Sequence, residues 1–237
     1  MRSDHGPLGA LYPQRIVDGR IGFMEGGGAA LWLALVRNGL DDPEQPAWGS
    51  WGGRFSAEKR FDVTATPSHV WETEHKWRHW AMYEEVADTW PDGAITSTSA
   101  CAPLWRWREA YHNDFQGRMD WCVKEFKGAN HNPVAAFRGD AGGGVVRLSV
   151  KPGERVPLDA SGSSDPDNDA LGFRWFPYPE VSTYAGAVGI SHANEKTAEL
   201  AVPVDAAGKQ IHVILEVKDR NSMVPMFAYR RIIIDIR

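Results

Sequence analysis

The sequence predicts an α+β chain in two parts: a mostly helical first part, patterned like a piece of an α/β domain, and an immunoglobulin-like β-sandwich. Ten of the 11 tryptophans lie in residues 32–121, and only Trp175 lies beyond them. The composition changes at residues 130–133, from helix-forming stretches to short β-branched runs separated by turn residues. One of these runs alternates between two faces, as a strand does. We therefore expect domains over 1–132 and 133–237.

The composition of the 237-residue chain argues against several classes of protein. With 43% apolar and 24% charged residues, the chain is able to bury a core and does not resemble a disordered tail. A net charge of -5 argues against a nucleic-acid partner, which favours a basic surface. We expect no membrane span, because no run of about 18 apolar residues is present. Two cysteines are too few for a disulfide scaffold or a four-thiolate zinc site.

Short β-branched runs bounded by Gly, Pro, Asp and Asn predict the strands of the sandwich. These runs are residues 134–137, 145–150, 155–159, 171–176, 197–204, 210–217 and 227–236. The clearest run places Ile211, Val213, Leu215 and Val217 on one face. Trp175 lies in the middle of a predicted strand, and we expect it to fill the core of the sandwich.

The first part has a mixed pattern. We expect helices over 29–36, 66–90 and 104–126, a loop over 39–55, and strands near 16–24 and 95–97. The helix over 104–126 has the best apolar stripe, with steps of three and four residues. The stripe consists of Leu104, Trp107, Tyr111, Phe115, Met119, Cys122 and Phe126, which makes Cys122 a predicted buried thiol. Asp114 and Arg118 have the i,i+4 spacing of an ion pair.

These helices have few strands to cover them. A helix with an apolar face needs another layer to pack against, and residues 1–132 offer only one or two strands. The first part therefore has the pattern of a piece of an α/β domain. Uncovered apolar helix faces would drive self-association.

Several long motifs resemble one family. They are HGPLGALYP (5–13), GFMEGG (22–27), NGLDDPEQPAWGSWGGRF (38–55), LWRWREAYHNDFQGRMDWCV (104–123) and NHNPVA (130–135). They resemble the bacterial cellulose-binding proteins that carry a nucleoside-hydrolase-like domain followed by a β-sandwich domain. The resemblance covers nearly the whole chain and implies the C-terminal half of such a protein: the end of the hydrolase-like α/β domain, then the sandwich.

The resemblance also implies a site that this sequence lacks. Nucleoside hydrolases hold an ion with an aspartate-rich motif, and no D-x-D-x-x-x-D-D run precedes Gly26. A later family aspartate, which would face the ion, is replaced here by Gly27. Hydrolysis of an N-glycosidic bond needs an ion-held water and a carboxylate to deprotonate it. We expect this chain alone to be inactive as a hydrolase.

Tryptophans in or beside loops are the candidate glycan contacts. Trp48 and Trp51 lie in the Gly-rich loop, where exposed rings would stack on a sugar and Arg54 would bond its hydroxyls. The alternative is that both rings fold back onto the helices as anchors, which is the favoured interpretation for Trp51. Trp105 lies off the centre of the apolar stripe and is a further candidate for a groove.

Charged and histidine residues offer weaker candidates. Glu25 is the carboxylate next to the glycine turn and is a candidate substrate contact, although a solvated or capping carboxylate is the favoured interpretation. His75 and His79 have the H-x-x-x-H spacing of metal ligands, but the Glu of a metalloprotease motif is absent, so we interpret them as surface residues. Asp165, Asp167 and Asp169 alternate in a turn; calcium is one interpretation and an Asx-type turn the other.

Three hypotheses follow for the function. The first is a carbohydrate-binding protein whose partner is cellulose or another glycan. The second is part of an N-glycosyl hydrolase that needs a separate N-terminal half, and the third is a non-functional structural remnant. Residues 1–14 lack the apolar core of a signal peptide, whereas the resemblance implies export to the periplasm or the outside of the cell.

Overall fold

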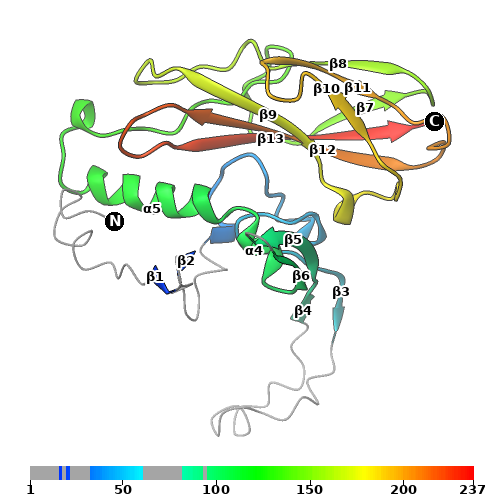
Figure 1. The fold of residues 1–237 in the computed structure, drawn as a ribbon, viewed down its shortest axis with the longest axis horizontal. Coiled ribbons are helices and arrows are strands. Elements are labelled where there is room, and N and C mark those ends of the chain that lie inside the picture. Colours follow the sequence, from blue (N-terminus) through cyan, green and yellow to red (C-terminus); the bar gives the residue numbers. More distant parts are fainter. Residues whose placement is uncertain (1–15, 18–19, 22–32, 61–81, 93–94) are drawn as a thin grey trace, which may run out of the picture.

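The computed structural model describes residues 16–17, 20–21, 33–60, 82–92 and 95–237 (Figure 1). The α-helices and strands of the first part are β1 (Ile16–Val17), β2 (Arg20–Ile21), β3 (Phe55–Arg60), β4 (Met82–Glu85), β5 (Asp88–Asp92), β6 (Ile95–Ser99), α4 (Ala102–Trp105) and α5 (Arg108–Trp121). The strands of the second part are β7 (Val146–Val150), β8 (Arg155–Asp159), β9 (Leu171–Pro177), β10 (Gly189–Ser191), β11 (Thr197–Ala201), β12 (Gln210–Asp219) and β13 (Phe227–Ile236). Short 3-10 turns are η2 (Pro46–Trp48), η4 (Phe126–Gly128) and η5 (Pro179–Val181).

The second part is a β-sandwich, as the alternating runs predicted. One sheet has the strand order β7-β13-β12-β9 and the other has the order β10-β11-β8. Neighbouring strands are antiparallel, except that β7 and β13 run parallel. Trp175 lies in the core between the sheets, 2% exposed, as predicted. Its Nε1 donates a hydrogen bond of 2.9 Å to the carbonyl of Glu195, which satisfies the polar edge of the buried ring.

The larger sheet is buried on both faces, which β12 shows best. Its residues Ile211, Val213, Leu215 and Val217 face the sandwich core, as their alternation predicted. Ile214 lies on the opposite face and belongs to a second core. The buried members of this second core come from both parts of the chain: Leu33, Leu40, Trp51, Trp107, Ala110, Tyr111, Tyr178, Ile214, Phe227 and Tyr229. The two parts therefore share a core, and the domain boundary at 132/133 stays a prediction.

Helix α5 lies alongside the outer face of the larger sheet (Figure 1). Trp107, directly before the helix, is 1% exposed and centres this contact. Its ring lies 5.3 Å from the ring of Tyr229 and 6.1 Å from those of Phe176 and Tyr178. Tilted and edge-on aromatic packing of this kind adds to the apolar burial. The sheet thus supplies the layer that the helix needs.

A loop next to Leu40 lies against the edge of β13. The backbone N–H of Tyr229 donates to the carbonyl of Asn38 at 2.8 Å. Gly39 follows with φ of 92°, and a Cβ on it would lie 2.0 Å from the carbonyl oxygen of Tyr229. Only glycine suits this position, because both the left-handed backbone and the close approach exclude a side chain.

The expectation of a mostly helical first part is wrong. Its described residues form the antiparallel pairs β1-β2, β3-β4 and β5-β6, with α4, α5 and the two helical residues 33 and 34. The strands expected near 16–24 and 95–97 are present. In place of the end of the helix expected over 66–90, the structure has β4 and the start of β5. Residues 66–81 of that expected helix lie outside the described ranges. Strand pairing of β-branched residues outweighs the helical pattern here: Thr89 and Thr98 face each other, with their hydroxyl oxygens 2.8 Å apart.

The helix expected over 104–126 is confirmed in part. It forms as α4 and α5, and the stripe residues Trp107, Tyr111 and Met119 are buried. The Asp114–Arg118 ion pair is present, with 2.6 Å between the carboxylate oxygen and Nε. The stripe fails at Phe115, which is 39% exposed within α5, and again beyond Trp121, where α5 ends.

The residues after the helix end face outward. Cys122 is exposed, so the buried-thiol prediction is wrong; the other cysteine, Cys101, is also exposed and free. Phe126 is 67% exposed. The stripe predicted burial for both residues because it assumed that helical geometry continued to Phe126.

Two smaller differences concern the strands of the sandwich. Residues 134–137 make only isolated bridges, from Val134 to Ser164 and from Phe137 to Asp140, and do not form the strand that we expected. A short strand that we did not expect, β10, lies at the edge of the smaller sheet. Within the described ranges, no helix is both long and apolar enough to cross a membrane.

Candidate functional site

Trp51, the first candidate glycan contact, is part of the shared core. Its side chain is 0% exposed, and its ring lies edge-on to the ring of Tyr229 with 6.3 Å between centroids. A ring without exposed surface offers no face to a sugar. The alternative interpretation of Trp51, an anchor folded back onto the protein, matches this placement.

Trp48 is half-buried at the end of η2 and lies against side chains of β7, β13 and β12 in the larger sheet. Its ring lies edge-on to His212, with 5.3 Å between centroids, and the guanidinium carbons of Arg147 and Arg231 lie 5.7 and 6.0 Å from its centre. Arg231 also donates to the carbonyl of Gly49 at 2.7 Å and so holds the loop in place. Trp48 thus keeps some exposed surface but is surrounded by cationic and aromatic partners.

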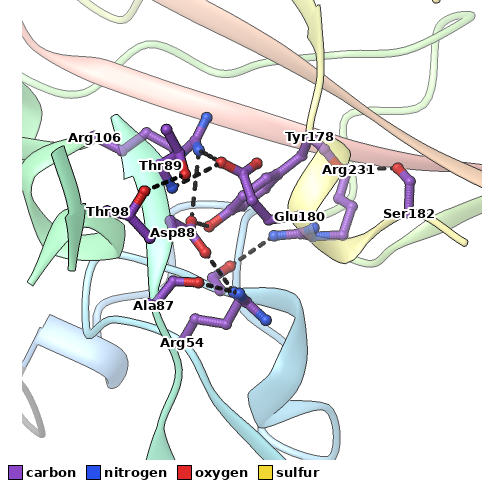
Figure 2. A network of polar contacts seen from close by, with 11 residues as sticks. Arg54, Ala87, Asp88, Thr89, Thr98, Arg106, Tyr178, Glu180, Ser182 and Arg231 are labelled. Carbon is purple, nitrogen blue, oxygen red and sulfur yellow. Dashed lines mark hydrogen bonds and ion pairs between the residues drawn. The ribbon is translucent and has the colours of Figure 1, made fainter. Parts of the chain in front are cut away.

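Arg54 belongs to a buried polar network between the two parts (Figure 2). Its Nε lies 2.6 Å from Oδ1 of Asp88, and its Nη2 donates to the carbonyl of Ala87 at 2.7 Å. The Asp88 side chain is 0% exposed, and Tyr178 donates a hydrogen bond of 2.5 Å to its second oxygen. The guanidinium of Arg54 is therefore used within the protein in this structure.

The same network continues to Glu180 through Arg106. Nη2 of Arg106 lies 2.7 Å from Glu180 and 3.5 Å from Asp88. Burial, with the charge of Asp88 as a second cause, raises the pKa of the Tyr178 phenol far above its ordinary value. The phenol therefore stays protonated and acts as a hydrogen-bond donor. These contacts connect β5, α4 and the sandwich, which is a structural role.

Trp105 ends α4 and is half-buried, with the guanidinium carbon of Arg108 5.7 Å from its ring centre. Glu25, His75 and His79 lie outside the described residues. The structure therefore does not bring the predicted contacts Trp48, Trp51, Arg54 and Trp105 together on one open face.

The aspartate turn is held by hydrogen bonds to protein groups. Oδ1 of Asp165 accepts from the backbone N–H groups of Asp167 and Asp169, and Oδ2 of Asp169 accepts from Asn221 at 3.0 Å. The carboxylate of Asp167 contacts His131 instead. No group of three or more His, Cys, Asp or Glu side chains within the described ranges is arranged to hold a metal ion. The geometry is that of the Asx-type turn, the alternative that the sequence left open.

A cluster of stacked aromatic rings lies at the end of α5 and in the segment after it. We call Trp121, Phe126 and His131 the aromatic surface. The His131 ring is stacked with both neighbours, at 3.9 Å from Phe126 and 5.7 Å from Trp121, with interplanar angles of 26° and 13°. Together with Lys124 and Ala129, the three rings line a surface pocket of about 330 Å³.

The rings of the aromatic surface are held by polar contacts. Nε1 of Trp121 donates to the carbonyl of Asn130 at 2.7 Å, and the guanidinium carbon of Arg118 lies 5.2 Å from the Trp121 ring. The backbone N–H of His131 donates to Asp167 at 2.8 Å, and its Nδ1 lies 3.0 Å from the same carboxylate. The aspartate turn therefore orients the central ring of this surface.

The pattern of the sequence did not predict the aromatic surface. It assigned Phe126 to the buried stripe and did not single out Trp121 or His131. Their spacing in the sequence gives no helical or strand period, because η4 reverses the chain between them. The available signal was the cluster of large rings directly before the composition change at residues 130–133.

The fold defines a two-part protein in which a β-sandwich is packed on a first part that contains both helices and strands. Family models match both parts: "Cellulose-binding Sde182, nucleoside hydrolase-like domain" over residues 1–55, and "Cellulose-binding protein Sde0182, C-terminal domain" over residues 155–236. At both ends, the chain therefore resembles this family of cellulose-binding proteins with a nucleoside hydrolase-like domain.

A solved structure is similar over nearly the whole chain. It is that of a nucleoside hydrolase-related hypothetical protein from Saccharophagus degradans, described as associated with carbohydrate metabolism. The sequence identity is 35% and the TM-score is 0.76, and the match covers 99% of this chain and 52% of that one. This chain thus spans about half the length of the solved relative. No match was found among curated proteins.

Proposed function

We propose that this chain binds a cellulose-like polysaccharide through the aromatic surface. The observation that carries the proposal is the stack of the exposed Phe126 ring with the half-buried rings of His131 and Trp121, which line a pocket of about 330 Å³. The family description, cellulose-binding, supports polysaccharide as the ligand class. Among the predicted partners, a glycan is the one for which this surface is suited.

The chemistry of the surface fits a sugar ring. A pyranose has a face of C–H groups that are slightly positive, and the negative face of an aromatic ring attracts them while both lose water. Phe126 is 67% exposed and offers such a face. Lys124, paired with Asp120 at 3.2 Å, lies at the pocket as a donor for sugar hydroxyls.

We further propose that this chain alone does not hydrolyse nucleosides. The support is the sequence, in which Gly27 stands at the family's late aspartate and no aspartate-rich run precedes it. The alternative, part of an N-glycosyl hydrolase that works with a separate N-terminal half, predicts cleavage only when that half is added. Nucleoside cleavage by the purified chain alone would contradict both expectations.

Retention on cellulose tests the binding proposal. The double variant Trp121→Ala/Phe126→Ala removes two ring faces, and we expect binding to weaken about tenfold or more. Phe115→Ala, on α5 and 39% exposed, is the matched control because it lies outside the pocket. Full retention by the double variant, with an unchanged circular dichroism spectrum, would overturn the proposal.

Two further predictions concern location and assembly. Because cellulose lies outside the cell, we propose that the protein works there; fractionation that finds it only in the cytoplasm would contradict this.

We also propose self-association through exposed apolar side chains, such as Leu35, which is 78% exposed. A clean monomer at high concentration in sedimentation would argue against it.

A further inference from the structure

A second pocket lies where the two parts meet the edge of β13. Residues of the loop before Leu40, of α5, of the segment 132–135 and of the loop 141–143 line it, and its volume is about 210 Å³. We call it the arginine pocket, because Arg37, Arg118 and Arg230 are among its lining residues. It shares no lining residue with the pocket of the aromatic surface.

Arg230 is the central observation. Its side chain is 1% exposed, and its Nη2 donates to Oδ2 of Asp140 at 2.7 Å. Its Nε and Nη1 are buried and have no hydrogen-bond partner among the described residues. Buried donors are nearly always paired, because an unpaired one forfeits its bond to water. A guanidinium with two free donors at a pocket wall is thus arranged for an acceptor that comes from outside.

The charge of the pocket also favours a negatively charged ligand. Three arginines and a single carboxylate, that of Asp114, line it, whereas the whole chain has a net charge of -5. Arg118 is paired with Asp114 at 2.6 Å and Arg230 with Asp140 at 2.7 Å, so Arg37 supplies the excess of positive charge in the lining. A cationic pocket on an acidic protein attracts anions.

Another donor lies close by. The side-chain oxygen of Asn38 accepts from the N–H of Leu40 at 2.9 Å, and this bond fixes the amide plane. Its Nδ2 is buried and without a partner among the described residues. The pocket therefore offers a neutral donor in addition to the guanidinium, which suits a ligand with several oxygen atoms.

Two glycines form the wall of the pocket beside Arg230. Gly142 and Gly143 line the pocket, and a Cβ on Gly142 would lie 3.8 Å from Nη1 of Arg230. The N–H of Gly142 donates to Asp140, and this bond, followed by the charge of Arg230, lowers the pKa of the Asp140 carboxyl. Asp140 is therefore a stable anion at 62% side-chain exposure, and a ligand anion would compete with it for Arg230.

We propose that the arginine pocket binds a small oxyanion, a carboxylate or phosphate group on a ligand no larger than one sugar unit. The volume is below the roughly 300 Å³ at which pockets for drug-sized ligands begin. The free Nε–H and Nη1–H groups of Arg230 point to different sides of the guanidinium, so each is able to donate a charge-assisted hydrogen bond to an oxygen of a carboxylate or phosphate. This site is separate from the aromatic surface, so neither proposal depends on the other.

Titration calorimetry of the whole chain with three probes tests the proposal. Glucuronate carries the carboxylate, inorganic phosphate carries the other oxyanion, and glucose is the neutral match of glucuronate. We expect at least one anion to bind with a Kd of about 1 mM or lower, and glucose to bind at least tenfold more weakly. Binding of glucuronate alone identifies a carboxylate site, and binding of phosphate alone a phosphate site. No anion binding, or equal binding of glucose, would overturn the proposal.

Variants assign the binding to Arg230. Arg230→Gln should abolish it, and Arg230→Lys should weaken it at least tenfold because an ammonium lacks the fork of donors. Arg174→Gln is the matched control, since Arg174 is an exposed arginine of the same sandwich, paired with Glu216 outside the pocket. An equal loss in Arg174→Gln would contradict the site.

A further variant, in which binding should become tighter, tests the proposal even if the Arg230 variants do not fold. Asp140→Asn keeps an oxygen that is able to accept from Gly142 but removes the charge that competes for Arg230. We expect severalfold tighter anion binding in this variant. Unchanged or weaker binding in folded Asp140→Asn would overturn the proposal, whatever the fate of the Arg230 variants.

Discussion

Tyr178 and Asp88 lie 90 residues apart in the sequence, and the phenol of the first donates a hydrogen bond of 2.5 Å to the carboxylate of the second. Tyr178 follows β9 of the sandwich, and Asp88 begins β5 of the first part. Both side chains are buried, and Arg54 and Arg106 lie around the carboxylate (Figure 2). This contact therefore joins the two parts through a charge that is neutralised inside the protein.

Removing the charge of Asp88 should destabilise the chain strongly. In Asp88→Asn, Arg54 and Arg106 lose their shared carboxylate in a buried site, and breaking a buried pair costs about 3–5 kcal/mol. Tyr178→Phe removes only a hydrogen bond and should cost about 1 kcal/mol. Urea unfolding measures both free energies. Equal midpoints for Asp88→Asn and the unchanged protein would show that the network carries no stability.

Gly39→Ala should be far more harmful than an alanine at an open glycine. The new Cβ would lie 2.0 Å from the carbonyl oxygen of Tyr229, in a backbone with φ of 92°. Gly208→Ala is the matched control, because Gly208 has φ of 72° but no atom within 4 Å of a Cβ, and so it reports the backbone strain alone. That strain costs about 1–2 kcal/mol. Thermal unfolding compares the two, and similar losses would refute the close contact.

Trp51 and Trp48 should differ in what their removal does. Trp51→Ala empties a fully buried site and should cost about 3–5 kcal/mol of unfolding free energy. Trp48→Ala, at a half-buried site, should cost about 1 kcal/mol. Chemical denaturation checks the order. Loss of cellulose retention in folded Trp48→Ala would return that loop to the list of glycan contacts.

His212 should make the protein less stable in acid. Burial, with Arg231 and Arg147 as further causes, lowers the pKa of His212 from 6.5 to about 3. Its Nδ1 lies 3.2 Å from Nη1 of Arg231, and its Nε2 lies 3.2 Å from Oε1 of Gln210. The neutral ring with its proton on Nε2 satisfies both contacts. A proton on Nδ1 would instead face the guanidinium.

The sign of the pH dependence follows from that shift. Below about pH 6.5 the unfolded chain binds a proton at this histidine and the folded chain does not, so stability falls down to about pH 3. The slope is roughly 1.4 kcal/mol for each pH unit. His212→Gln removes this titration, so its unfolding free energy should depend less on pH over this range. Parallel pH profiles of the two proteins would exclude a buried neutral His212.

The sandwich could be predicted from the sequence because its signal is local. The alternation along 210–217 sets which side chains enter the core, and the register of β12 and β13 follows the same period. The first part could not be predicted as well, because tertiary pairing decides its structure. Trp51 packs against Tyr229, which lies far from it in the sequence. The spacing of residues around Trp51 therefore does not predict this contact.

The candidate sites could be predicted only as residue types. Tryptophan was the correct residue type for the aromatic surface. The site at Trp121 depends on the chain turning back after α5, which places the His131 ring beside the Trp121 ring. Arg230 lies opposite Leu215 in the register, at a position of β13 whose alternate neighbours Ala228 and Ile232 belong to the sandwich core. Its importance comes from the absence of a partner among the described residues, which is a property of the folded surroundings and not of the sequence.

The outer face of the larger sheet has a consequence for how this sandwich is inherited and used. Ile214, Phe227 and Tyr229 on that face are buried by side chains such as Trp51 and Trp107 of the first part. A sandwich that begins after residue 132 would expose these side chains to water and would tend to aggregate. The sheet and the helix that covers it are therefore expected to be kept together when the gene is recombined. A fusion protein that includes this sandwich should contain at least residues 33–237.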